Sequence, residues 1–262
     1  MSMESMSMPT PEKPIQPPVF TFEKVGDISP EQEAQVQEAC ERAANSLAEE
    51  YQTREPISVN VCIMSNEKFR EGAKENDPAS WKFCFLLRDQ GGDLKDSSKN
   101  KVYINVDIFS ILPNDADRMI KHEIAHLVVA NLVGNFDAYK QSFLLEEGTA
   151  GLDMATETLI SKIKKENIKD IPSPLQIKNI GDAKLIGGDT NVEPFTEQFG
   201  DLIMMSFVEF LKKKHGTEKI VEVYKKLNDE TSLQEVYKKV CGEDLEEISE
   251  EWKKTINNSL TK

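Results

Sequence analysis

Apolar residues fill most of the second half of "MIKHEIAHLVVANLV", residues 119–133. An α-helix that is apolar on every side is buried in a protein core. Asn114 is a good N-cap residue, and Asp115 and Asp117 would then lie near the positive end of the helix dipole. Gly134 is a residue type that ends helices. The pattern therefore predicts a buried helix from Asn114 to Gly134.

Amphipathic and alternating segments surround this helix. Residues 29–52 predict a helix with a capping box formed by Ser29 and Gln32. Alternating or β-branched segments predict strands at 57–64, 81–89 and 101–109. Beyond residue 140 the periodicity is helical, and a long irregular loop at 168–194 interrupts it. The helices are expected at 142–165, 195–215, 217–228, 231–240 and 243–258.

This order of elements predicts an α+β fold with two subdomains. Residues 1–20 are rich in Met, Ser and Pro and are expected to form a disordered N-terminal arm. Residues 21–135 would form a small sheet-plus-helix subdomain that carries the buried helix. Residues 136–262 would form a mainly helical C-terminal subdomain, with an active-site cleft between the two.

Composition limits the classes of binding partner and the cellular compartment that are expected. The net charge of −14 argues against nucleic acid or an anionic membrane as a partner. No apolar run approaches the roughly 20 residues of a membrane-spanning helix, and the N-terminus lacks the pattern of a signal peptide. The four cysteines are widely spaced and form no CxxC pair, which favours free thiols in a reducing cytosol. A cytoplasmic location is therefore expected.

The buried helix carries His122, Glu123 and His126 in the sequence HEIAH. Residues four apart lie on one face of a helix, so both imidazoles can reach one cation. Glu123 points about 100° away and could instead take a proton from water at that cation. The alternative is a pair of hydrogen-bonded core histidines beside a solvated glutamate.

A zinc site would need a third ligand, and the chain offers few. His215 precedes Gly216 and follows three lysines, which indicates a helix C-terminus rather than a ligand. Glu146 and Glu147, in "SFLLEEGTAGLDM", are the carboxylate candidates. Such glutamate pairs are commonly solvated surface residues.

The combination of HEIAH with the later "LLEEGTA" resembles the thermolysin-like gluzincin metallopeptidases. The C-terminal region, with a His-Gly pair after a helix and Trp252 in the last helix, is similar to that group as well. The resemblance covers roughly residues 55–256. It implies one zinc ion per chain, bound by His122, His126 and Glu147, with Glu123 as general base. It also implies that the strand at 101–107 is the edge strand that pairs with a peptide substrate.

Two positions depart from the family pattern. Thermolysin-like members carry a carboxylate four residues after the ligand glutamate, where this chain has Gly151. Asp153 or a backbone carbonyl would then have to orient a histidine. The tyrosine or histidine that stabilises the oxyanion is also missing from "FTEQFGDL", and Tyr103 is one candidate to replace it.

The choice between Glu146 and Glu147 follows from helix geometry. Adjacent residues point about 100° apart, so only one of the two can face the HEIAH helix. Glu147 shares a stripe with Leu144 and Ala150, whereas Glu146 lies on a more polar line. The small residues Gly148 and Ala150 would let this helix approach the HEIAH helix closely. Glu147 is therefore the expected ligand.

These observations favour an intracellular zinc-dependent peptidase that acts on peptide or protein substrates. A gluzincin-fold metal-binding regulatory module with little or no hydrolytic activity is the first alternative, and the missing oxyanion donor would explain it. A purely structural domain with a coincidental HExxH sequence is the second.

Overall fold

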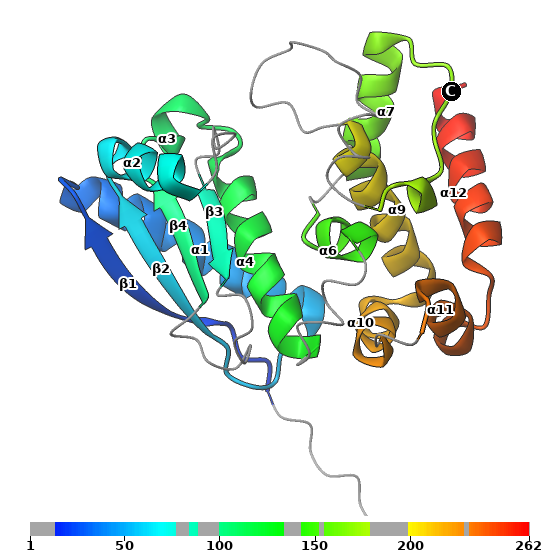
Figure 1. Cartoon of the computed structure of the whole chain (residues 1–262), viewed down its shortest axis with the longest axis horizontal. Helices are drawn as coiled ribbons and strands as arrows, with labels where there is room; N and C mark the ends of the chain where they lie inside the picture. The colour runs from blue at the N-terminus through cyan, green and yellow to red at the C-terminus, as the bar shows by residue number, and fades with distance from the viewer. Residues whose placement is uncertain are drawn as a thin grey trace, which may run out of the picture.

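The chain forms a mixed fold, with a small sheet near the N-terminus and helices over most of the remainder (Figure 1). The structure is a computed structural model that describes residues 14–76, 84–88, 100–133, 143–151, 155–178, 199–227 and 231–261. The α+β class predicted from the sequence is confirmed at this level.

The sheet has the strand order β1-β2-β4-β3. β1 (Val19–Val25), β2 (Ser58–Met64) and β4 (Asn100–Asn105) are parallel neighbours, and β3 (Cys84–Arg88) pairs antiparallel with β4. The strand predicted at 101–109 therefore ends early and is internal. The expectation that it forms the substrate-binding edge is wrong, because β3 covers it.

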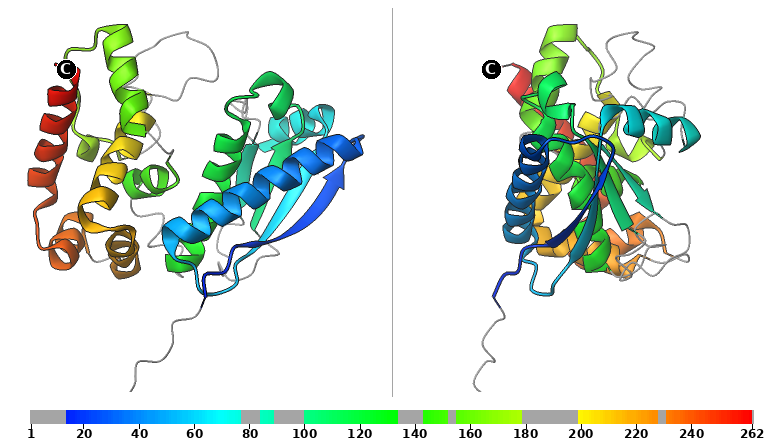
Figure 2. Two further views of the ribbon diagram at one scale, coloured as in Figure 1. Left: turned by 180° about the vertical axis from the view of Figure 1, so that it is seen from behind. Right: turned by 90° about the vertical axis from the view of Figure 1, so that its left-hand side faces the viewer.

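Both faces of the sheet are covered, which explains the nearly continuous apolar sequence of β2. Val59, Val61 and Ile63 belong to the main core with helices α1 (Pro30–Tyr51) and α4 (Ala116–Val133). Cys62 and Met64 face the other way and pack with Phe69 of α2 (Asn66–Asn76). Figure 2 shows α1 lying along one face of the sheet.

Helix α1 begins as its sequence predicts. The Gln32 N–H donates to Ser29 Oγ over 3.3 Å, and the Ser29 N–H donates to Gln32 Oε1 over 3.0 Å. This reciprocal pair satisfies backbone donors that the first helical turn leaves unpaired. The predicted capping box is confirmed.

Helix α4 is buried as predicted, since all seven residues from Ile124 to Ala130 are buried. Its start differs from the prediction. Asn114 lies in a turn before the helix, and the Asp115 carbonyl accepts the Met119 N–H over 2.9 Å. Asp115 therefore occupies the cap position. Gly134, the predicted end, lies outside the described residues.

Helices make up the described C-terminal part of the chain. They are α6 (Phe143–Thr149), α7 (Ala155–Glu166), the 3₁₀ turn η2 (Pro174–Gln176), α9 (Phe199–His215), α10 (Thr217–Lys226), α11 (Leu233–Cys241) and α12 (Leu245–Leu260). The single helix predicted at 142–165 is divided in two. At the division, the Ala150 and Gly151 N–H groups turn back to the carbonyls of Glu146 and Gly148, each over 3.3 Å.

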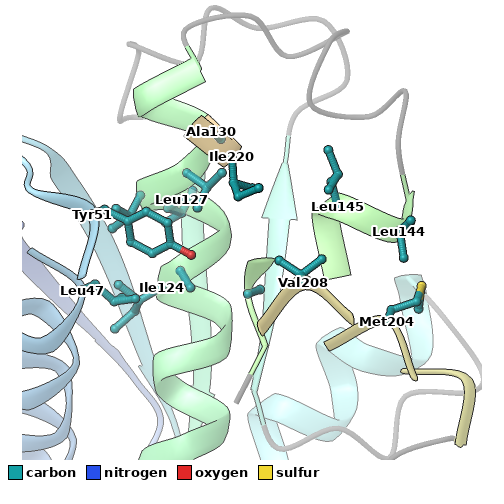
Figure 3. Packing of buried hydrophobic residues seen from close by; sticks show 14 of the residues in the cluster. Leu47, Tyr51, Ile124, Leu127, Ala130, Leu144, Leu145, Met204, Val208 and Ile220 are labelled. Atoms are coloured by element: carbon teal, nitrogen blue, oxygen red, sulfur yellow. The ribbon is translucent and has the colours of Figure 1, made fainter. Parts of the chain in front are cut away.

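One hydrophobic cluster extends from the sheet to α12. Trp252, Tyr224 and Phe207 are among its largest fully buried side chains. Figure 3 shows part of it, where Ile124 and Leu127 of α4 lie beside Tyr51 of α1. The elements of the two predicted halves therefore share a continuous core.

The predicted N-terminal arm is too long at its C-terminal end. The Gln16 N–H donates to the Thr53 carbonyl over 2.8 Å, and Thr53 Oγ1 donates to the Gln16 carbonyl over 2.7 Å. Strand β1, which the sequence analysis missed, begins at Val19. Residues 14–20 are therefore attached to the fold, whereas residues 1–13 lie outside the described residues.

Two further expectations concern thiols and membranes. Cys40 and Cys62 are buried, Cys241 is partly buried, and all three are free thiols. Within the described residues, no helix has the length and apolar character needed to cross a bilayer.

Candidate metal centre

Helix α4 places His122 and His126 one turn apart, as their spacing predicts. Their Nε2 atoms lie 3.1 Å apart, and their rings meet nearly edge to face, with centroids 4.6 Å apart. Two neutral imidazoles at this distance can share a hydrogen bond, if one ring holds its proton on Nε2. Two imidazoles that ligate one cation would lie at a similar distance. The histidine pair alone therefore fits both interpretations.

Glu147 of α6 brings a carboxylate to this pair. Its Oε2 atom lies 3.5 Å from Nε2 of His122 and 3.9 Å from Nε2 of His126. Within the described part of the chain, these three residues form the group of His, Cys, Asp or Glu side chains that could share a metal ion. The residues predicted as metal ligands therefore do come together, from two separate helices.

The spacing of the three donor atoms fits a tetrahedral ion. Bonds of about 2.0–2.1 Å at tetrahedral angles place neighbouring ligand atoms about 3.3–3.4 Å apart. The three observed distances, 3.1, 3.5 and 3.9 Å, bracket this value. The side chains are also shielded from solvent, with 18% of His122, 7% of His126 and 25% of Glu147 exposed. The donor set is thus compact, largely shielded from solvent and chemically suited to a metal ion.

Glu146 is outside this group. This is expected, because adjacent residues of a helix point about 100° apart. Burial does not separate the two glutamates, because both are partly buried. The distinction comes from direction: the carboxylate of Glu147 faces α4. Glu147, the residue favoured by the buried-stripe argument, is thus the glutamate that lies beside the histidines, although it is only partly buried.

The small residues of this segment pack differently from expectation. A Cβ atom on Gly148 would lie 2.4 Å from Val208 Cγ2 and 2.8 Å from the Met204 carbonyl oxygen, both on α9. Gly148 therefore allows close approach to α9, and the expected approach to α4 is wrong for this residue. Ala150 lines a pocket together with His122 of α4.

Glu123 is partly buried and directly follows His122 on α4. Helix geometry directs it about 100° from His122, on the side opposite to Lys121. A carboxylate in this position flanks the metal ligands without belonging to the group that they form. Glu123 is therefore a neighbour of the candidate ligands and not a member of their group.

A pocket of about 370 Å³ adjoins the other side of His122. Residues of α1 and of the first half of α4 form its walls, and Ala150 and Gly151 close it beside the histidine. Arg42 and Asp117, two of its lining residues, form a bidentate ion pair with both distances at 2.9 Å. Because Lys121 and not Glu123 lines it, the pocket lies on the flank away from the expected general base.

Gly151 has no room for the carboxylate that thermolysin-like members carry there. A Cβ atom would lie 2.7 Å from the Gly148 carbonyl oxygen and 2.9 Å from Cβ of Met205. The space beside Gly151 is filled by Met205 of α9 and by the Gly148 carbonyl. Asp153, the suggested substitute, lies outside the described residues.

Tyr103 lies on the opposite face of the sheet from the helix that carries the candidate ligands His122 and His126. It packs with Cys62, Met64 and Phe69 on the face of the sheet that α2 covers. Helix α4 packs on the opposite face, with Val102 and the rest of the main core. The suggestion that Tyr103 stabilises an oxyanion is therefore wrong.

His215 ends α9, as its sequence context predicts, and is separate from the ligand group. Its Nε2 atom lies 3.1 Å from Oε2 of Glu243, and its ring meets Tyr237 edge to face. Burial is the main cause that lowers the pKa of His215, while the nearby Glu243 carboxylate acts in the opposite direction. This histidine belongs to the packing of α9 against α11.

Comparisons with known proteins add no family assignment: no family model, curated protein or solved structure matches this chain.

Proposed function

We propose that the chain is a zinc-dependent peptidase of the gluzincin type. The observation that carries this proposal is the meeting of His122, His126 and Glu147 from α4 and α6, with donor atoms 3.1–3.9 Å apart. Glu123 completes the HExxH motif on α4. Two imidazoles and one carboxylate are a common ligand set of catalytic zinc.

The number of ligands favours a catalytic over a structural ion. Structural zinc sites are usually closed by four protein ligands, whereas catalytic sites keep one position open. Three protein ligands are present in this group. When bound there, zinc would supply a water molecule acidic enough to deprotonate near neutral pH, and it would polarise a substrate carbonyl.

Glu123 would accept the proton of that water and later deliver it to the leaving amine. A carboxylate is suited to both steps because it accepts a proton when ionised and donates one when protonated. His122 and His126 must stay neutral on Nε2 to ligate, so their role is to hold the ion and not to transfer protons.

The substrate would be a peptide or protein segment in a cleft between the two halves of the molecule. β3 is the outermost strand on the side of β4, and α4 packs next to it. An extended peptide could add to this edge as a further strand, with backbone hydrogen bonds as the main contacts. We therefore assign to β3 the pairing with a peptide substrate that the resemblance implied for the strand at 101–107.

The placement of Tyr103 favours one alternative, a metal-binding module that hydrolyses little. With Tyr103 on the far face of the sheet, no oxyanion donor is assigned among the described residues. Loss of one such donor commonly lowers kcat about 10²–10³-fold. A slow or inactive enzyme would still bind metal.

One experiment separates these functions. Purified protein would be analysed for zinc and then incubated with a library of fluorogenic peptides, with and without a chelator. Bound zinc together with chelator-sensitive cleavage supports the peptidase. Bound zinc without cleavage supports the metal-binding module. A chain that binds no metal contradicts both.

A further inference from the structure

A chain of polar side chains connects the two helices that carry the metal ligands. At one end is Lys121, which directly precedes His122 on α4. At the other end is Thr149, the last residue of α6, which follows Glu147 by two positions. Between them lie Glu50 and Tyr51 of α1 and Lys212 of α9. This connection runs separately from the metal ligands themselves.

The Thr149 end of the connection is buried and fully paired. The Tyr51 hydroxyl donates to the Thr149 carbonyl over 2.8 Å, and Nζ of Lys212 donates to the same oxygen over 3.3 Å. Oγ1 of Thr149 lies 3.0 Å from the Tyr224 hydroxyl on α10. Thr149 thus has partners on three other helices.

The Lys121 end is an ion-pair network with Glu50 at its centre. Oε1 of Glu50 accepts a 2.8 Å hydrogen bond from Lys212, and Oε2 lies 3.8 Å from Nζ of Lys121. Lys212 also donates to the Tyr51 hydroxyl over 2.9 Å. The side chains of Lys212, Lys121 and Glu50 are 16%, 17% and 28% exposed, so solvent screens these charges less than those of surface pairs.

α6 needs such support because of its length. It has seven residues, and an isolated helix of this size is unstable in water. The carbonyl groups at its end also lack the helical N–H groups that would follow in a longer helix. Tyr51 and Lys212 supply donors to one of them, and the Lys212 cation lies at the negative end of the helix dipole. The position of α6 therefore depends on residues of α1 and α9.

We propose that Tyr51, Lys212 and Glu50 are positioning residues that set the metal affinity of the site through Glu147. This inference rests on the metal centre of the proposed function. The three residues connect the end of α6 to α1, α9 and α4, and so keep the Glu147 carboxylate beside both imidazoles. Small displacements of ligands weaken metal sites, and residues that orient ligands commonly change affinity about 10–100-fold.

The test measures zinc affinity by competition with a chromophoric chelator. Tyr51→Phe removes one hydroxyl and keeps the ring in the core, and Lys212→Met removes the cation and keeps most of the aliphatic stem. Each is expected to weaken zinc binding about tenfold or more. Lys213→Met is the matched control, because Lys213 lies on the same helix and pairs with Glu209, which bonds to Thr156 of α7 and not to Thr149. Its zinc affinity should match that of the unmodified chain.

A double-mutant cycle distinguishes an effect of Tyr51 on the position of Glu147 from a general loss of fold stability. If Tyr51 acts through Glu147, Tyr51→Phe in a Glu147→Gln background should change zinc affinity by less than about twofold. An equal loss in both backgrounds would overturn the inference, as would unchanged affinity in both Tyr51→Phe and Lys212→Met. The far-UV spectrum and melting of the metal-free variants confirm that each is folded.

The outcomes also distinguish this inference from the proposed function. An unmodified chain that binds no zinc contradicts both. A chain that binds zinc and shows the predicted cycle but cleaves no peptide contradicts the peptidase alone. Zinc-dependent cleavage together with additive losses contradicts the positioning role alone.

Discussion

Nε2 of His122 lies 3.5 Å from Oε2 of Glu147, across the contact between α4 and α6. The carboxylate is about three-quarters shielded from solvent, and a charge in such a place needs a partner. A neutral imidazole can offer it one hydrogen bond, whereas a cation shared with His126 would neutralise it. We therefore expect that Glu147 contributes to metal affinity.

Glu147→Ala should lower zinc affinity at least roughly tenfold, whereas Glu146→Ala should change it little. The two residues are adjacent and both partly buried, so they serve as matched variants. The physical difference between them is direction, because only Glu147 joins the histidine group. Competition with a chelator measures both affinities. Equal values, or a larger loss from Glu146→Ala, would contradict the assignment.

Glu123→Gln should retain zinc and lower kcat sharply. Glutamine has nearly the same shape but cannot accept the proton of the attacking water, and loss of a general base commonly costs about 10²–10⁴-fold. Zinc content and steady-state hydrolysis of the best peptide from the library are measured on the same preparation. Glu146→Gln is the control for loss of a nearby negative charge. If the Glu123 variant binds zinc and keeps its kcat, Glu123 has no part in proton transfer.

Short stretches of sequence correctly predicted those features that depend only on neighbouring residues in the chain. The capping box of α1 and the all-round burial of α4 follow from short stretches of sequence, and both are present. The i, i+4 spacing of His122 and His126 likewise fixes their geometry once the helix exists. These parts of the candidate site could be read directly from the sequence.

Pairings between distant segments could not be predicted in the same way. The strand order β1-β2-β4-β3 depends on contacts between segments that are far apart in the sequence. The residue pattern of β4 would suit an edge strand as well as an internal one, so it could not show that β3 pairs with it. β1 was missed because none of its residues is fully buried: Phe20, Phe22 and Val25 are partly buried, and the other four residues are exposed. The partners of Thr149 were also missed, since Tyr51 and Lys212 lie far from it in sequence.

Residues 14–20 should contribute to stability, in contrast to the expectation that they belong to a disordered N-terminal arm. Two chains would be compared, one beginning at Pro14 and one at Thr21. The shorter chain loses both hydrogen bonds between Gln16 and Thr53, the bond from Val19 to the Ile57 carbonyl, and the packing of Phe20 on the core. At about 1 kcal/mol for each hydrogen bond, its melting temperature should fall by about 5 °C or more.

The chain that begins at Pro14 is the control in that comparison. It retains all of these contacts, so its melting temperature should be close to that of the full-length protein. If both truncated chains melt together with the full-length protein, the contacts of residues 14–20 do not stabilise the fold.

Removal of metal should abolish hydrolysis while it leaves the helices intact. The purified chain should contain about one zinc per molecule, bound by His122, His126 and Glu147. The main hydrophobic cluster extends from the sheet to α12 without passing through these ligands, so folding does not depend on the ion as it does in a zinc finger.

Dialysis against a chelator, followed by elemental analysis, a peptide assay and the far-UV spectrum, tests each part. Restored activity on adding back zinc shows that the loss was not due to unfolding. Collapse of the helical signal on chelation would contradict this account of the fold, and full activity without metal would contradict the role of the ion.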